Sequence, residues 1–235
     1  MNGKENKTAL VTGANRGIGL AIARGLLQKG YEVIITSRSF DKATEAAKKL
    51  ETLGQVIAIE LDVSDDRSID RAFETINQKI DRLDVLINNA GIYPDEGVNI
   101  LTIDRELLEL TLNTNTFGAI KMVQKFLPLL EQSPDARIIN VSSSYGEING
   151  LSANVPSYCL SKLALNGATI MLADALNSKG IVVNSICPGW VRTDMGGASA
   201  PRTPEQGADT AIWLATEASR KETGKFWRDR QVISY

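Results

Sequence analysis

Short runs of consecutive apolar residues recur along the chain, each rich in valine, isoleucine and leucine. They cover residues 8–12, 31–36, 55–60, 85–88, 137–141 and 181–186. A strand buried on both faces of a parallel sheet has this continuous apolar character, whereas a half-exposed strand alternates apolar and polar residues. The runs therefore predict six strands of one parallel sheet.

Longer segments with helical periodicity separate these strands. They cover 17–29, 41–53, 65–79, 105–131 and 156–179, and the fourth is predicted to break near 113–115. Gly30, Gly54 and Gly180 follow three of the predicted helix ends, where a left-handed residue commonly stops a helix. Alternating strands and helices with short connections predict an α/β fold: a Rossmann-type doubly wound parallel sheet, in a single domain over 1–235.

Composition narrows the classes of function. The 235 residues carry a net charge of −2 with no long basic run, which argues against a nucleic-acid partner. The longest apolar run, 17–23, is far below the about 18 residues that a membrane helix needs, and no signal-peptide pattern precedes the first strand. Cys159 and Cys187 lie in separate apolar segments, which suits a reducing compartment. We expect a soluble cytoplasmic protein.

The chain contains no histidine. Its absence excludes Ser-His-Asp and Cys-His nucleophile systems, histidine zinc helices and histidine-ligated haem, and we expect no metal site. Any proton transfer must therefore use a carboxylate, a lysine, a tyrosine or water.

A glycine-rich turn joins the first predicted strand to the first predicted helix. Its glycines, Gly13, Gly17 and Gly19, have the spacing G-x-x-x-G-x-G. Such a turn lets the backbone approach a pyrophosphate, which then sits at the positive end of the following helix. The predicted dinucleotide site also includes three residues that lie between these glycines: Asn15, Arg16 and Ile18. The alternative is a turn that merely requires positive φ.

Two arginines indicate which dinucleotide binds. An NAD site places an acidic residue after the second strand, but here that position holds Arg38, and Arg16 lies in the glycine turn. Two guanidinium groups suit a 2′-phosphate, so we predict NADPH. Asp41 is interpreted as a first-turn helix residue. The alternative is that both arginines are solvated surface charges.

Two further strand ends carry candidate cofactor contacts. Asp62 and Val63 follow the third strand and could reach the adenine, although Asp62 also suits a simple turn. Asn89, Ala90 and Gly91 follow the fourth strand and could approach the ribose, but they too are ordinary turn residues.

Tyr158 and Lys162 are four residues apart on a predicted helix and therefore share one face. A nearby ammonium favours the phenolate and is expected to lower the tyrosine pKa towards the working pH. Ser142, Ser143 and Ser144 end a strand at the sheet edge where ligands bind, so a hydroxyl there could hold a substrate oxygen.

Taken together, these motifs resemble the short-chain dehydrogenase/reductase family over essentially the whole chain. The set includes the glycine turn, Asn88 to Gly91, Asn115, Ser143, Tyr158-x-x-x-Lys162 and Pro188-Gly189. Within the family, segments 115–118, 188–195 and 223–229 are most similar to the NADPH-dependent carbonyl reductases.

The resemblance implies a role for each residue. Tyr158 would be the general acid, Lys162 would tune it and bind the nicotinamide ribose, and Ser143 would bind the carbonyl oxygen. Asn115 would hold a water linked to Lys162. The implied nicotinamide contacts are Pro188, Gly189, Val191 and Thr193.

The chain lacks the long insertion between serine and tyrosine that is associated with monomeric carbonyl reductases. Helices near 105–131 and 156–179 are therefore expected to pair, giving a homodimer or homotetramer.

The predicted function is the reduction of ketones, aldehydes or quinones. Residues 194–203 are predicted to form a short lid over the substrate pocket, which either leaves the pocket open or becomes ordered when substrate binds. One alternative is a 3-oxoacyl-carrier-protein reductase, which would need a basic patch from residues such as Arg105, Lys121, Lys125 and Arg202. A second alternative is a regulatory protein that binds NADPH without catalysing a reaction.

Overall fold

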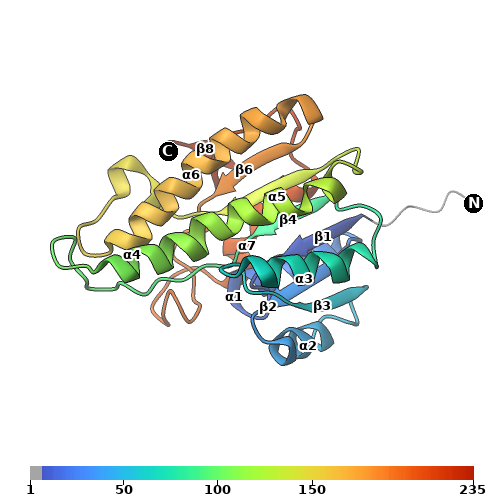
Figure 1. Ribbon diagram of the computed structural model, residues 1–235, viewed down its shortest axis with the longest axis horizontal. Helices are drawn as coiled ribbons and strands as arrows, with labels where there is room; N and C mark the ends of the chain where they lie inside the picture. The colour runs from blue at the N-terminus through green and yellow to red at the C-terminus, as the bar shows by residue number, and fades with distance from the viewer. Residues whose placement is uncertain (1–6) are drawn as a thin grey trace, which may run out of the picture.

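The computed structural model describes residues 7–235, which build one eight-stranded sheet covered by helices (Figure 1). The strand order is β3-β2-β1-β4-β5-β6-β7-β8, parallel throughout except for the antiparallel β7–β8 pair. The strands are β1 (Thr8–Val11), β2 (Glu32–Ser37), β3 (Val56–Glu60), β4 (Val85–Asn88), β5 (Arg137–Val141), β6 (Val182–Ile186), β7 (Phe226–Arg228) and β8 (Gln231–Ile233). The predicted α/β, Rossmann-type fold is confirmed.

Helices cover both faces of the sheet. They are α1 (Gly17–Gln28), α2 (Phe40–Lys48), α3 (Asp66–Asn77), α4 (Arg105–Leu112), α5 (Gly118–Leu130), α6 (Pro156–Leu176) and α7 (Pro204–Thr216). Alternate residues of each strand point to opposite faces: Ala9 and Val11 pack with α1 and α7, whereas Leu10 packs with α3 and α5. Figure 1 shows α3, α5 and α6 across the near face of the sheet. Burial on both faces explains the continuous apolar runs.

The predicted break in the fourth helix is a π-helical segment, Asn113–Phe117, that joins α4 to α5. The predicted stops at Gly30 and Gly180 are confirmed, with φ of 83° and 67°. The prediction for 41–53 is wrong at its end, because α2 finishes at Lys48 and the chain continues in turns before Gly54.

The hydrophobic pattern did not predict three C-terminal elements, α7, β7 and β8. Strands β7 and β8 have three residues each, too few for an apolar run. Helix α7 begins with a capping box in which Thr203 and Gln206 bond each other's backbone.

The segment Pro156–Lys179, which contains α6, is the single segment among residues 7–235 whose length and hydropathy would suit a membrane span. Half of its most apolar window is buried, as in a core helix. The prediction that no signal peptide precedes the first strand concerns residues 1–6, which lie outside the described residues.

Candidate active site

Four loops at the carboxyl edge of the sheet bring the predicted residues together. They follow β1, β4, β5 and β6, and the first two turns of α6 lie against them. Carboxyl ends of adjacent parallel strands share one edge, so residues more than a hundred positions apart become neighbours there.

The glycine loop packs closely against the segment after β4. A Cβ on Gly13 would lie 3.0 Å from the Cα of Ala90, and one on Gly19 would lie 2.5 Å from Nδ2 of Asn89. That same Nδ2 donates to the carbonyls of Thr12 and Gly13, at 2.9 and 3.1 Å. Side chains at these glycines would force the two segments apart.

The start of α1 suits a phosphate group. Its N-cap residue, Arg16, has extended backbone and makes no side-chain cap, so the first helical N–H groups are available to an anion. Gly13 and Gly17 have positive φ, of 62° and 57°, whereas Gly19 is required by close packing alone. A turn that needed only positive φ would not require Gly19. Asn15 is half-buried and Ile18 packs against the core beside them.

The two arginines predicted to bind a 2′-phosphate lie at the same edge. The N–H of Ala14 donates to the carbonyl of Thr36 at 2.9 Å, which fastens the glycine loop to the end of β2, and Arg38 is exposed two residues later. Arg16 forms an ion pair with Asp194 of the lid, and both side chains are exposed. Asp41 lies in the first turn of α2, as predicted.

Asp62 takes the turn role that the sequence left open. Its Oδ1 accepts hydrogen bonds from the backbone and hydroxyl of Ser64, at 2.9 and 2.6 Å. Val63 is buried, and its carbonyl would lie 2.5 Å from a Cβ on Gly118. Contact of either residue with adenine stays a prediction.

Tyr158 and Lys162 face the same buried region on α6. Tyr158 is 8% exposed and Lys162 is 4% exposed, with the ammonium 5.6 Å from the centre of the phenol ring. Lys162 Nζ donates to the carbonyl of Val141 at 2.8 Å. The rings of Tyr93 and Tyr145 meet that of Tyr158 edge-on, with centroids 4.7 and 6.1 Å away.

Burial sets the protonation of this pair. It raises the pKa of Tyr158 well above its usual range, and a hydrogen bond with Ser143 only partly opposes it. Burial also lowers the pKa of Lys162 to about 8. The expected lowering of the tyrosine pKa is therefore wrong for this structure, because desolvation of the buried phenol is the largest effect on it.

The structure distinguishes the three adjacent serines. Ser143 lies close enough to the phenol of Tyr158 to lower its pKa. Ser142 is buried and its hydroxyl lies 3.4 Å from the backbone carbonyl of Lys162, whereas Ser144 is exposed. Ser143 is thus the serine whose hydroxyl meets the phenol.

Asn115 lies in the π-helical segment and is almost fully buried. Its amide bonds both backbone groups of Ile92, at 2.8 and 2.9 Å, and donates to the Ser161 hydroxyl at 3.0 Å. A Cβ on Gly91 would lie 3.1 Å from Asn115 Oδ1 and 3.6 Å from Lys162 Nζ. Gly91 thus lets the backbone approach both side chains, and the water expected between Asn115 and Lys162 stays a prediction.

The segment after β6 covers the glycine loop. Thr193 Cγ2 lies 3.1 Å from the position of a Cβ on Gly17, and Val191 is buried. Gly189 has φ of 76°, and Arg202 donates to the carbonyl of Pro188 at 2.9 Å. Of the predicted nicotinamide residues, Thr193 therefore lies next to the glycine loop.

The lid is short and bonded to itself. Residues Val191 and Arg202 form an isolated bridge at its base, and the Trp190 indole donates to Gly196 at 2.7 Å while remaining half-exposed. The sequence did not identify Asp95 or Tyr145 as neighbours of the site, because neither belongs to a recognisable motif. Asp194 and Arg202 lie in the lid predicted over 194–203, but the sequence did not predict their partners.

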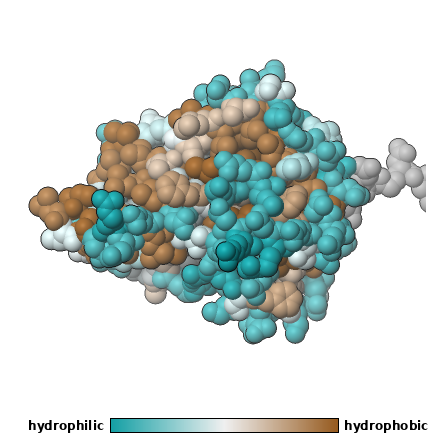
Figure 2. All heavy atoms as spheres, viewed as in Figure 1, coloured by the Kyte–Doolittle hydropathy of each residue, from teal (hydrophilic) through white to brown (hydrophobic). Residues whose placement is uncertain are grey.

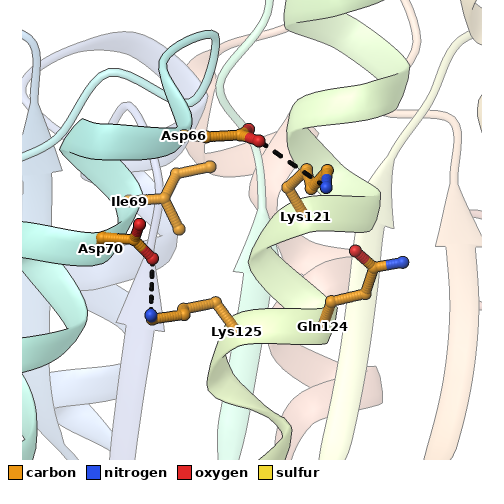
Figure 3. Close-up of a pocket in the computed structure, with 6 residues that line it drawn as sticks. All are labelled: Asp66, Ile69, Asp70, Lys121, Gln124 and Lys125. Atoms are coloured by element: carbon orange, nitrogen blue, oxygen red, sulfur yellow. Dashed lines mark ion pairs between the residues drawn. The ribbon is translucent and has the colours of Figure 1, made fainter.

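A separate groove of about 220 Å³ lies between α3 and α5 (Figure 3). Lys121 and Lys125 of α5 pair there with Asp66 and Asp70 of α3, at 3.6 and 2.5 Å. None of the predicted site residues lines this groove.

Comparison with known proteins agrees with this geometry. The family model described as short chain dehydrogenase matches residues 7–203. Short-chain dehydrogenase anuI of Penicillium roqueforti is 37% identical over 240 residues, covering 95% of this chain and 94% of that protein. The 3-oxoacyl-(acyl-carrier-protein) reductase FabG of Aquifex aeolicus is 32% identical, covering 94% of each.

A crystal structure of NADPH-bound carbonyl reductase from chicken fatty liver is also similar. It has a TM-score of 0.89 and 30% sequence identity, covering 98% of this chain and 99% of that one. The chain therefore belongs to the short-chain dehydrogenase/reductase family and is an oxidoreductase that works with a nicotinamide dinucleotide.

Proposed function

We propose that this protein reduces ketones, aldehydes or quinones to alcohols with NADPH. The observation that carries the proposal is the buried phenol of Tyr158, with Ser143 and the Lys162 ammonium next to it. The similarity to an NADPH-bound carbonyl reductase supports it.

The nicotinamide, when bound, supplies the hydride that reduces the carbonyl carbon. Tyr158 gives its proton to the carbonyl oxygen, and Ser143 holds that oxygen with its hydroxyl. The raised pKa of Tyr158 keeps the phenol protonated at neutral pH, as a proton donor must be. Lys162 stabilises the phenolate that remains, and Asn115 holds the water through which the proton is replaced.

NADPH is proposed over NADH because Arg16 and Arg38 lie at one edge, joined through the Ala14–Thr36 bond. Guanidinium groups favour a 2′-phosphate, and a carboxylate repels it. Arg38→Asp is expected to reverse the preference, measured as kcat/KM with each reductant. Equal kcat/KM for NADH and NADPH in the unmodified protein would contradict the assignment.

A role on acyl groups attached to a carrier protein is less well supported, despite the similarity to FabG. Such a partner is acidic and needs several basic residues clustered beside the site. The candidate cations instead pair with carboxylates of this chain: Lys121, Lys125, Arg105 and Arg202 face Asp66, Asp70, Glu109 and Asp229. A sensor without turnover would not require the complete set of Asn115, Ser143, Tyr158 and Lys162.

The decisive experiment monitors NADPH oxidation with quinones, aromatic ketones, aldehydes and oxoesters. Tyr158→Phe is expected to lower kcat at least a thousandfold while cofactor still binds, because the general acid alone is removed. Tyr31→Phe removes a hydroxyl that bonds Ala215 away from the site, and it should retain activity. Near-normal turnover by Tyr158→Phe would refute the mechanism.

A further inference from the structure

We infer that Asp95 is a positioning residue that fixes the first turn of α6 and, through it, the hydroxyl of Tyr158. Asp95 lies in the loop after β4 and is fully buried. The kinetic part of the inference rests on the proposed function, whereas the structural part does not.

Helix α6 cannot cap its own N-terminus. The N-cap residue is Val155, which makes no side-chain cap, and Pro156 at the first helical position has no N–H. The first available donors are the N–H groups of Ser157 and Tyr158. In a buried helix end, such donors are costly unless a partner is supplied.

Asp95 supplies that partner from more than sixty residues away. Its Oδ2 accepts the N–H of Ser157 at 2.6 Å and the N–H of Tyr158 at 3.2 Å. A carboxylate at the positive end of a 21-residue helix is also favoured electrostatically. The bond to Tyr158 means that the capped residue is the proposed general acid itself.

The second carboxylate oxygen of Asp95 makes this arrangement unfavourable for stability. Oδ1 is buried and finds no hydrogen-bond partner within residues 7–235. An unpartnered buried carboxylate oxygen opposes folding, so stability alone would favour a different cap.

The charge of Asp95 also acts on two neighbours of Tyr158. Burial raises the pKa of Tyr93 to about 12, and it also raises that of Cys159; the charge of Asp95 adds to both shifts. Tyr93 packs against the Tyr158 ring and Cys159 follows it in the helix. The carboxylate therefore holds the backbone of Tyr158 directly and acts on the neighbouring groups through its charge.

The rest of α6 has other anchors. Ser157 Oγ lies 3.0 Å from Thr111 Oγ1 of α4, Ser161 binds Asn115, and Lys162 binds the Val141 carbonyl. Loss of Asp95 should therefore loosen Tyr158 while Lys162 and the glycine loop stay in place. The expected signature is a reduced kcat with unchanged cofactor affinity, since small misplacement of a reacting group costs up to about a hundredfold in rate.

The test compares Asp95→Ala and Asp95→Asn with Asp104→Ala. Asp104 caps α4 through a 2.7 Å bond to the N–H of Leu107 and is exposed, so its loss removes a helix cap outside the site. Three quantities are measured: hydrogen exchange at the Ser157 and Tyr158 amides, NADPH affinity by fluorescence titration, and kcat on the best carbonyl substrate.

Asp95→Ala is expected to speed exchange at both amides at least tenfold and to lower kcat about 10- to 100-fold, with NADPH affinity within twofold. Asp95→Asn keeps one acceptor oxygen for the Oδ2 position and should recover most of kcat. If the alanine variant does not fold, Asp95→Asn should still exchange faster at both amides, because a neutral oxygen accepts a hydrogen bond more weakly than a carboxylate does. Asp104→Ala should leave all three quantities within twofold.

Unchanged exchange at both amides would overturn the inference. Parallel losses of kcat and NADPH affinity would do the same, because they indicate general destabilisation. If the unmodified protein reduces no carbonyl substrate, the proposed function fails, and amide exchange still decides the role of Asp95.

Discussion

At the scale of single residues, burial decides what the site can do. The sequence places Tyr158 and Lys162 on one helical face, but it does not show that both are more than nine-tenths buried. The sign of the tyrosine shift therefore could not be predicted, because desolvation and the lysine charge act in opposite directions. Residue types and spacing likewise left three adjacent serines open, and only the family resemblance selected Ser143.

Lys162 gives the protein a specific pH dependence of stability. Its pKa is about 8 when folded and 10.5 as an ordinary lysine. Between these values the unfolded chain holds the proton that the folded chain has lost, so the free energy of unfolding should rise with pH. Below pH 8 Lys162 is charged in the folded protein. The difference between the two pKa values means that burying this charge lowers the free energy of unfolding by about 3 kcal/mol.

Lys162→Met should therefore abolish the rise between pH 8 and 10.5 and stabilise the protein at pH 7. Urea denaturation at several pH values measures both effects. Comparing the two proteins removes the contribution of Tyr158, whose raised pKa lowers stability above pH 10 in each. A pH profile that is the same in both proteins would contradict the assignment.

At the scale of elements, close backbone contacts position the site. The hydrophobic pattern predicted six strands and the break in the 105–131 helix, because both depend on local sequence. It could not show that the break is a π-helical segment that turns Asn115 onto Ile92, since that partner is 23 residues away. Such segments are frequent at functional sites.

Gly118, the first residue after that segment, tests this packing. A Cβ there would meet the backbone carbonyl of Val63 at 2.5 Å, and a carbonyl in a loop cannot rotate away. Gly118→Ala should lower the free energy of unfolding by about 1–3 kcal/mol.

Gly25→Ala in α1 is the matched control, because its Cβ would meet only the flexible side chain of Ile212. The gain in helix propensity, about 1 kcal/mol, should offset that contact. Equal effects of the two substitutions in thermal or urea unfolding would contradict this account of Gly118.

At the scale of the whole molecule, one face of the protomer remains apolar. Figure 2 shows hydrophobic side chains gathered over α6 in the same view as Figure 1. The exposed apolar residues of α4, the π-helical segment and α6 are Leu110, Phe117, Leu160, Ile170 and Met171. A second copy of the chain is the occupant we propose for this face, and a homodimer or homotetramer stays a prediction.

Light scattering after size exclusion measures the assembly. One chain is 25.5 kDa, so two copies give 51 kDa and four give 102 kDa. Met171→Glu should reduce the mass, because Met171 is 72% exposed on this face and a charge there opposes association. Leu53→Glu, a substitution after α2, should leave the mass unchanged. A monomer of the unmodified protein would refute the prediction.

Arg202 bonds both Pro188 and Asp229, and these contacts can form only late in the synthesis of the chain. Strand β6 ends at Ile186, and its outer neighbour β7 begins 40 residues later, at Phe226. Until that stretch has been made, one edge of β6 has no partner, and Asp229 cannot yet pair with Arg202 beneath the Pro188 carbonyl. A nascent chain held at this stage would expose an unpaired strand edge, the feature most prone to aggregation. Slow translation between residues 187 and 225 should therefore lower the yield of soluble protein.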